Sequence, residues 1–208
     1  MYDAGATVSI AAVHRWHLAV AEWTRALATE LQMPLAMAGC NLYISPSGRG
    51  LPMHFDNHEG MFVQLVGSKQ WRIAENRTVR FPGSNSSKDL PAHVQSYASG
   101  PAPTKMPKGP TVNLKPGSAL FLSRGWWHTT NAKEPSISLS FGFRVPSWVE
   151  VVRDELISVL MKDEKWREPA WALWAEGGPA EQTKERWAQL RERLAEKVKA
   201  IQASDLAR

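Results

Sequence analysis

The chain has 208 residues, of which 43% are hydrophobic and 22% charged, an ordinary composition for one globular domain with a small appendage. No apolar run approaches the roughly 20 residues that a membrane-spanning helix needs, and the N-terminus lacks the basic-then-apolar layout of a signal peptide, so we expect a cytoplasmic protein that does not enter a membrane. The single cysteine, Cys40, excludes an intrachain disulfide and a thiolate metal cluster. The formal charge of +5 is spread along the chain without a dense basic tract, so nucleic acid is not the expected substrate.

The first half of the chain changes its hydrophobic period twice. Apolar side chains recur at helical spacing over residues 10–33, which predicts a helix that ends before Pro34. Residues 41–73 alternate with a period of two between turn signals, which predicts several short antiparallel strands. Residues 75–110 are rich in Pro, Ser, Gly, Asn and Lys without periodicity. This long irregular loop is either a lid or binding segment, or a disordered surface insertion.

Strand signals return after residue 110. The segments Thr111-Val-Asn-Leu114 and Ala119-Leu-Phe-Leu122 are separated by a Lys115-Pro-Gly117 turn. The next strand, residues 136–143, alternates small and bulky side chains without exception. Short strands with regular turns predict a mainly β fold, a sandwich or small barrel. The small face of the last strand consists of Ser136, Ser138, Ser140 and Gly142.

The character becomes helical after Pro146. Two apolar stripes at helical spacing follow, separated by Gly177-Gly178-Pro179. We therefore expect one β domain over residues 1–145 and a helical extension over 146–208, whose stripes pack on the barrel or on a second subunit, with a homodimer as the leading expectation. The stripes are Val149, Val152, Leu156, Val159 and Leu160 in the first, and Trp187, Leu190, Leu194, Val198 and Ile201 in the second.

The strongest chemical signal is His54-Phe-Asp56 together with a distant histidine. Residues two apart in a strand project from the same face, so an imidazole and a carboxylate can converge. His128 follows a Gly125 turn and would complete a set of two histidines and one carboxylate, which leaves positions open on Fe(II) for cosubstrate and O2. Alone, a His-x-Asp triplet arises often by chance, and a strand histidine more often packs than binds metal.

Lys69 adds an independent signal. It shares its strand phase with Trp71 and Ile73, so if these point into the core Lys69 does too. A buried ammonium is costly unless an anion meets it, and a cosubstrate carboxylate would be such an anion. The alternative is a Lys69 side chain that faces solvent or extends to the rim of the core.

Several motifs in order along roughly residues 2–145 resemble the JmjC-type cupin oxygenases that depend on Fe(II) and 2-oxoglutarate, most of all their ribosomal-oxygenase-like branch, which hydroxylates protein side chains. The resemblance implies a double-stranded β-helix, or jelly roll, with an N-terminal helix and a helical C-terminal extension. The motifs that carry it are His54-Phe-Asp56, Phe62-Val-Gln64, Gly67-Ser-Lys69-Gln-Trp71, Lys115-Pro-Gly117, Gly125-Trp-Trp-His128 and Ser140-Phe-Gly-Phe-Arg144.

The resemblance also implies roles for individual residues. Iron would be held by His54, Asp56 and His128. The cosubstrate contacts would be Lys69, which takes the distal carboxylate of 2-oxoglutarate, and Ser45, Ser138 and Ser140. His58 and Trp127 would contact substrate, although His58 is in phase with His54 and Asp56 and is also a candidate fourth ligand, a partner of a ligand or an ordinary surface side chain.

The implied reaction consumes O2 and 2-oxoglutarate, releases succinate and CO2, and hydroxylates a C–H bond of a protein or peptide side chain, a ribosomal protein among the candidates. Alternatives are a small-molecule or natural-product oxygenase, an N-methyl demethylase, a 2-oxoglutarate-independent cupin enzyme and a non-catalytic cupin-like binding protein. The branch usually carries an upstream segment and a winged-helix domain that this sequence does not show, so we expect a minimal form or a fragment.

Overall fold

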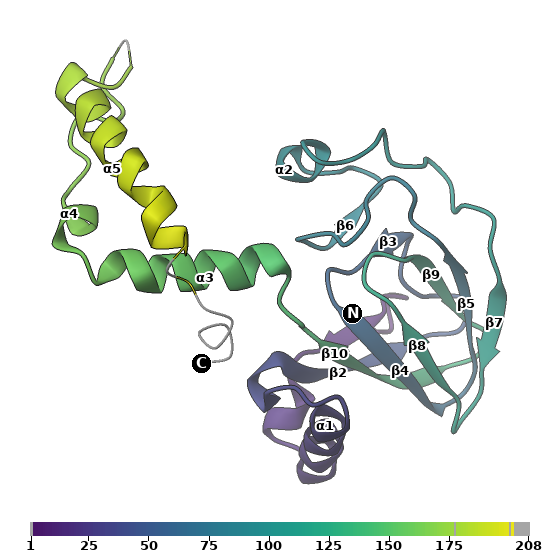
Figure 1. Ribbon diagram of the computed structural model, residues 1–208. Helices are drawn as coiled ribbons and strands as arrows, with labels where there is room; N and C mark the ends of the chain where they lie inside the picture. The colour runs from purple at the N-terminus through teal and green to yellow at the C-terminus, as the bar shows by residue number, and fades with distance from the viewer. Residues whose placement is uncertain (1, 177, 200, 202–208) are drawn as a thin grey trace. The chain divides into compact units, whose positions relative to one another are not determined.

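The protein is described by a computed structural model that covers residues 2–176, 178–199 and 201. It forms two compact units, Met1–Val145 and Pro146–Arg208 (Figure 1). In the part of the chain that the structure describes, the first unit contains all the strands and the second contains three helices. Among the described residues, no helix combines the length and the apolarity that crossing a membrane requires.

Two five-stranded sheets form the first unit, and neighbouring strands in both are antiparallel. This arrangement confirms the predicted jelly roll. In spatial order, the first sheet contains β1 (Val8–Ile10), β2 (Ala38–Ser45), β10 (Ser136–Phe143), β4 (Glu59–Val66) and β8 (Ala119–Leu122). The second contains β6 (Ser86–Ser87), β3 (His54–Phe55), β9 (Trp127–Ala132), β5 (Lys69–Ala74) and β7 (Thr111–Leu114).

The N-terminal helix is shorter than the predicted 10–33. The 3-10 turn η1 spans Val13–Arg15, α1 spans Leu18–Glu30, and a second 3-10 turn, η2, spans Leu35–Met37. The helix starts late because the preceding residues pair as β1 with β2 and because Ala12 adopts a left-handed conformation with φ of 54°. A hydrophobic period alone does not reveal such a pairing.

The two faces of strand β10 lie in different surroundings because its bulky and small side chains alternate. Its bulky residues Leu139, Phe141 and Phe143 form a buried cluster with Val20 and Ala28 of α1. Helix α1 therefore covers the outer face of the first sheet (Figure 1). The serine face of β10 is consequently turned toward the interior of the barrel, as the alternation of the sequence predicts.

The irregular segment 75–110 is packed. It contains β6 and the short helix α2 (Ala92–Gln95), and its buried side chains Val79, Leu90 and Val94 form a core cluster with Phe55 of β3. The interpretation as a disordered insertion is therefore wrong, because the sparse apolar residues of the segment pack together with Phe55 and Trp127 in one core cluster.

The second unit consists of α3 (Trp148–Met161), α4 (Glu164–Arg167) and α5 (Glu181–Lys199). A capping box starts α3, in which the Ser147 side chain accepts from the Glu150 backbone N–H and the Glu150 carboxylate accepts from the Ser147 backbone N–H. Asp163 precedes α4, and its Oδ2 forms an ion pair with Nζ of Lys197 of α5 at 3.1 Å. None of the three helices has a buried side chain.

Candidate metal centre

Three potential metal ligands meet inside the barrel. Strands β3 and β9 pair with His54 directly opposite His128, and Asp56 lies just past the end of β3. One ligand atom from each residue lies within 4.8 Å of the others. Strand β3 is only two residues long, so the carboxylate reaches this point from the turn that follows it.

Hydrogen bonds fix both imidazoles in the orientation that metal binding requires. Nδ1 of His54 lies 2.7 Å from the Pro52 carbonyl oxygen, and Nδ1 of His128 lies 3.0 Å from that of Trp126. A carbonyl only accepts, so each Nδ1 carries the proton and donates, which leaves each Nε2 lone pair available. Nε2 of His128 lies 3.6 Å from Oδ2 of Asp56.

Electrostatics favour the neutral imidazole that binds metals. Burial, followed by the neighbouring His54, lowers the pKa of His128 to about 4. His128 is therefore uncharged at neutral pH. Two imidazoles and one carboxylate form a donor set that suits Fe(II) and leaves part of the coordination sphere open.

The turn before His128 is tied to the turn that carries Asp56. The Gly125 backbone N–H donates to the Asp56 carbonyl oxygen at 2.8 Å. Gly125 has a φ of 83°, and a Cβ there would lie 2.8 Å from Pro82. Glycine is therefore required where the two ligand-bearing segments meet the irregular segment.

The triad lines a cavity of about 130 Å³. The sequence-predicted residues Ser45, Ser140, Lys69 and His58 also line it, whereas Ser138 does not line the cavity but contacts Lys69. His58 is not part of the three-residue cluster of potential ligands. The remaining lining residues are Thr7, Asn41, Tyr43, Leu51, Phe62, Trp71, Asn85 and Thr130.

Lys69 is the most unusual group in the cavity. Its residue is only 3% exposed, and its Nζ donates to Ser138 Oγ at 2.9 Å. Among the described residues it has no acidic partner within ion-pair distance. Burial lowers the pKa of Lys69 to about 8. A cation kept this dry, with a single hydroxyl partner, is matched to an anionic ligand.

The structure does not bring Trp127 to this cavity. Trp127 alternates with His128 on β9, so the two side chains point to opposite faces of the sheet. It is 1% exposed and packs edge-to-face on Phe55 with ring centroids 4.8 Å apart. The orientation of Trp127 could have been predicted from the sequence. Successive side chains of a strand point to opposite faces, so a residue next to a metal ligand on a strand points away from the metal.

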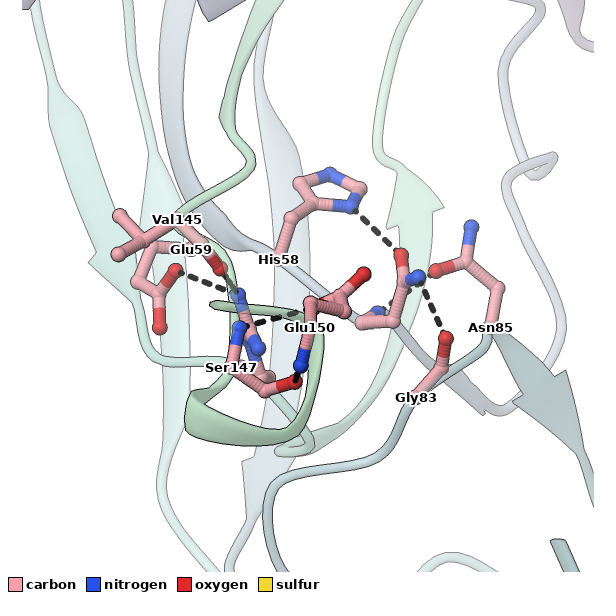
Figure 2. Close-up of polar contacts among 9 residues, drawn as sticks. His58, Glu59, Gly83, Asn85, Val145, Ser147 and Glu150 are labelled. Atoms are coloured by element: carbon pink, nitrogen blue, oxygen red, sulfur yellow. Dashed lines mark hydrogen bonds and ion pairs between the residues drawn. The ribbon is translucent and has the colours of Figure 1, made fainter. Parts of the chain in front are cut away.

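The sequence reasoning missed Asn85, which joins the irregular segment to the ligand turn. Asn85 Oδ1 accepts from the Asn57 backbone N–H at 2.6 Å, and Asn57 Nδ2 donates to the Gly83 carbonyl oxygen at 3.1 Å. Figure 2 shows Gly83 and Asn85 at this turn, with His58 beside it. Next to these contacts, β6 pairs with β3 and places Ser87 opposite His54. The segment therefore braces both ligands of the His-x-Asp motif.

Replacing Asn85 with alanine is expected to weaken metal binding about tenfold, because partners that hold a ligand segment typically contribute 10- to 100-fold. Asn85→Asp keeps an acceptor for the Asn57 N–H and should restore most of the affinity. The measurement is a Co(II) titration under identical conditions. Asn113→Ala, which removes a surface contact to Gln70, is the matched control. Equal affinities of Asn85→Ala and wild type would show that the turn holds Asp56 without this contact.

A jelly roll whose interior gathers two imidazoles and one carboxylate defines a cupin with a candidate site for a divalent metal. The chain belongs to the JmjC domain family, whose model matches residues 15–151. This confirms the predicted family.

Two individual proteins are similar to this chain in sequence. The chain is 30% identical over 175 residues to the uncharacterized protein YxbC of Bacillus subtilis (strain 168), covering 81% of this chain and 53% of that protein. It is 29% identical over 100 residues to ribosomal oxygenase 2 of Bos taurus, covering 48% of this chain and 19% of that protein.

Solved structures of the ribosomal oxygenase YcfD from Escherichia coli share the fold. One superposes with a TM-score of 0.56 at 21% identity, covering 96% of this chain and 48% of that chain. Another, a complex with cobalt and 2-oxoglutarate, has a TM-score of 0.55 at 22% identity and covers 93% and 47%. The chain thus spans about half the length of YxbC and of YcfD.

Proposed function

We propose that the protein is an Fe(II)- and 2-oxoglutarate-dependent dioxygenase that hydroxylates a C–H bond of a protein or peptide side chain, with succinate and CO2 as coproducts. The observation that carries the proposal is the presence, in one cavity, of the His54, Asp56 and His128 cluster and the buried cation of Lys69. The first fits a metal and the second fits a carboxylate. The family and its ribosomal-oxygenase relatives support the reaction class.

The proposed division of labour follows from the donors that each residue offers. His54, Asp56 and His128 would hold Fe(II), with Nδ1 of each imidazole anchored to a backbone carbonyl so that only Nε2 faces the metal. When bound, Fe(II) would activate O2, the oxidant, and 2-oxoglutarate would supply two of the four electrons that O2 takes up, the other two coming from the substrate C–H bond. The protein's own task is to leave part of the coordination sphere open and to keep bulk water out.

Lys69 would bind the distal carboxylate of 2-oxoglutarate, and the Ser138 hydroxyl would orient its ammonium. Ser45 and Ser140 line the same cavity and offer hydroxyl groups to the rest of the cosubstrate. Trp71 lines it as well, and its buried Nε1 has no hydrogen-bond partner within the described protein. An unmatched buried donor of this kind fits a bound acceptor.

The proposal is tested by turnover of carboxyl-labelled 2-oxoglutarate with Fe(II), ascorbate and a broad peptide panel. We expect succinate and CO2 in stoichiometric amounts, stimulated by a subset of peptides and absent in His128→Ala. A product heavier by one oxygen indicates hydroxylation, whereas released formaldehyde indicates demethylation. If no condition yields succinate, the protein is a cupin-like binding protein and the proposal fails. Succinate that only small molecules stimulate would overturn the proposed protein substrate.

We also propose that the second unit mediates a homodimer. Its three helices bury no side chain, and the predicted stripe residues Val149 and Trp187 are 78% and 54% exposed. Apolar helical faces of this kind are stable when a partner covers them. A second copy of the same unit offers complementary stripes.

Sedimentation is expected to give the mass of a dimer for wild type and of a monomer for the double variant Val149→Glu/Val152→Glu. Two carboxylates on the stripe would have to be desolvated at an interface. Ser158→Glu, on an exposed position of the same helix, adds charge away from the stripe and should remain dimeric. A monomeric wild type at high concentration would contradict this part of the proposal.

A further inference from the structure

The turn that precedes His128 carries a nearly buried arginine. Arg124 lies between the end of β8 and Gly125, and its side chain is 9% exposed. It is not among the residues that line the metal cavity. Any effect of Arg124 on the site must therefore pass through the groups that its guanidinium contacts.

One nitrogen of this guanidinium contacts two strand ends. Nη2 lies 3.6 Å from Oε2 of Glu59, the first residue of β4, and donates to the backbone carbonyl oxygen of Val145, just past the end of β10. Figure 2 shows these two acceptors, Glu59 and Val145, in one network. Oε2 of Glu59 is buried and accepts no hydrogen bond from any described residue, so the guanidinium compensates its charge. Arg124 thus connects three consecutive strands of the first sheet: β8, which precedes it, β4 and β10.

The same turn is linked to both ends of the ligand set. The Gly125 backbone N–H, next in sequence to Arg124, donates to the Asp56 carbonyl oxygen at 2.8 Å. The Trp126 carbonyl oxygen, one residue further on, lies 3.0 Å from Nδ1 of His128. A shift of the turn would therefore move both the Asp56 segment and the hydrogen-bond partner of the His128 ring.

Stability alone does not account for the ion pair of Arg124 and Glu59. Two largely buried charges lose hydration, and apolar side chains of similar volume often stabilise a fold as well or better. Nε of Arg124 is also buried without a hydrogen-bond partner among the residues that the structure describes, which adds to the cost. What the guanidinium supplies is direction, because it must stay where both of its acceptors can be reached.

We infer that Arg124 is a positioning residue of the candidate metal centre, which fixes the turn before His128 relative to the segment that joins Asp56 to β4. The inference rests on the proposed function for the identity of the metal ligands. The hydrogen bond from Gly125 to Asp56 is the part of this connection that can be observed without metal.

The metal-free protein gives the first readout. Hydrogen exchange of the Gly125 amide reports the bond to the Asp56 carbonyl oxygen, and the amides of β10 report the opening of the whole sheet. In Arg124→Met, exchange at Gly125 is expected to become about tenfold faster relative to the β10 amides, because one of two connections between the segments is lost. An unchanged ratio of the two exchange rates would overturn the inference.

Cobalt binding gives the second readout. Arg124→Met should weaken Co(II) binding about tenfold and change the intensity of the visible Co(II) bands, because the ligands no longer hold the same geometry. Arg124→Lys keeps a cation beside Glu59 and should recover most of both. Arg77→Met, which removes an exposed ion pair with Glu75 in the same unit, is the matched control and should behave as wild type. Equal Co(II) affinities in Arg124→Met and Arg77→Met would overturn the inference.

A double variant separates positioning from stability. Arg124→Met alone leaves the Glu59 carboxylate without its partner, so the thermal unfolding midpoint should fall. Arg124→Met/Glu59→Gln removes both charges and should regain most of that midpoint, while Co(II) affinity and the Gly125 exchange ratio stay at the values of Arg124→Met. Recovery of Co(II) affinity together with the midpoint would show that the ion pair acts only through the stability of the fold, and would overturn the inference.

The outcome is distinguishable from that of the proposed function. If wild-type protein binds no Co(II), the proposed metal ligands are refuted, and the Gly125 exchange ratio still decides whether Arg124 holds the turn. If Co(II) affinity and Gly125 exchange respond to Arg124 as expected but no condition yields succinate, the oxygenase alone is refuted. Succinate formation by a protein whose Co(II) affinity ignores Arg124 would refute the positioning role alone.

Discussion

Replacing Asp56 with alanine is expected to weaken Fe(II) binding by more than about 100-fold and to abolish 2-oxoglutarate turnover. Asp56 is the only anionic group among the three potential ligands. Without it, the two imidazole ligands remain, which contribute no negative charge to offset a divalent cation. The measurement is an anaerobic Fe(II) titration followed by turnover on the same samples.

The fold should survive this change. The Asp56 side chain is 20% exposed and its backbone carbonyl, which accepts from Gly125, is retained. The thermal unfolding midpoint without metal should therefore be close to that of wild type. Asp89→Ala, at an exposed position of the irregular segment, is the matched control. Wild-type iron affinity in Asp56→Ala would place the metal elsewhere.

Lys69→Met is expected to make the protein more stable and less able to bind 2-oxoglutarate. A lysine pKa held at about 8 instead of 10.5 corresponds to roughly 3 kcal/mol of unfavourable interaction with the charged form. Methionine fills similar space without a charge, so unfolding in urea at pH 7 should require up to about 3 kcal/mol more. The affinity of the Co(II)-loaded protein for 2-oxoglutarate should fall about 100-fold, because the distal carboxylate loses its partner in a dry site.

The unfavourable contribution of the buried Lys69 ammonium to the stability of the fold decreases as the pH rises. Below pH 8 the Lys69 ammonium is protonated in both the folded and the unfolded chain, so its burial cost is fully present. Between pH 8 and 10.5 the folded chain releases the proton first, and the cost declines. The stability advantage of Lys69→Met should therefore shrink above pH 8, and 2-oxoglutarate affinity of wild type should fall as Lys69 loses its charge.

Two controls make the Lys69 result specific. Lys69→Arg keeps a cation and should retain part of the cosubstrate affinity, while Lys88→Met at an exposed position should alter neither readout. Unchanged 2-oxoglutarate affinity in Lys69→Met would show that Lys69 does not bind the distal carboxylate. Lower stability of that variant would mean that Lys69 has an anionic partner within the protein.

The parts of the site that could be predicted lie on regular strands. Alternation placed the serines of β10 inside the barrel and Lys69 on the same face as Trp71, and the structure gives these orientations. The same rule, applied to β2, would also have found Asn41 and Tyr43, which are in phase with Ser45 and line the cavity. It would have removed Trp127, which is out of phase with His128.

The parts that could not be predicted depend on contacts between irregular segments. Asn85 lies in a stretch without periodicity, so only the folded chain reveals that it meets Asn57. The start of α1 was obscured because β1 pairs with a strand some thirty residues away, a contact that local spacing does not encode.

The most direct test of a shared iron and 2-oxoglutarate site is the visible charge-transfer band that forms when 2-oxoglutarate chelates Fe(II). Wild-type protein is titrated anaerobically with Fe(II) and then with 2-oxoglutarate, beside His54→Ala and Asp56→Ala. We predict a weak visible band for wild type that both variants lack. Absence of the band in wild type, or its persistence in either variant, would contradict the assignment of His54, Asp56 and His128 as the iron ligands.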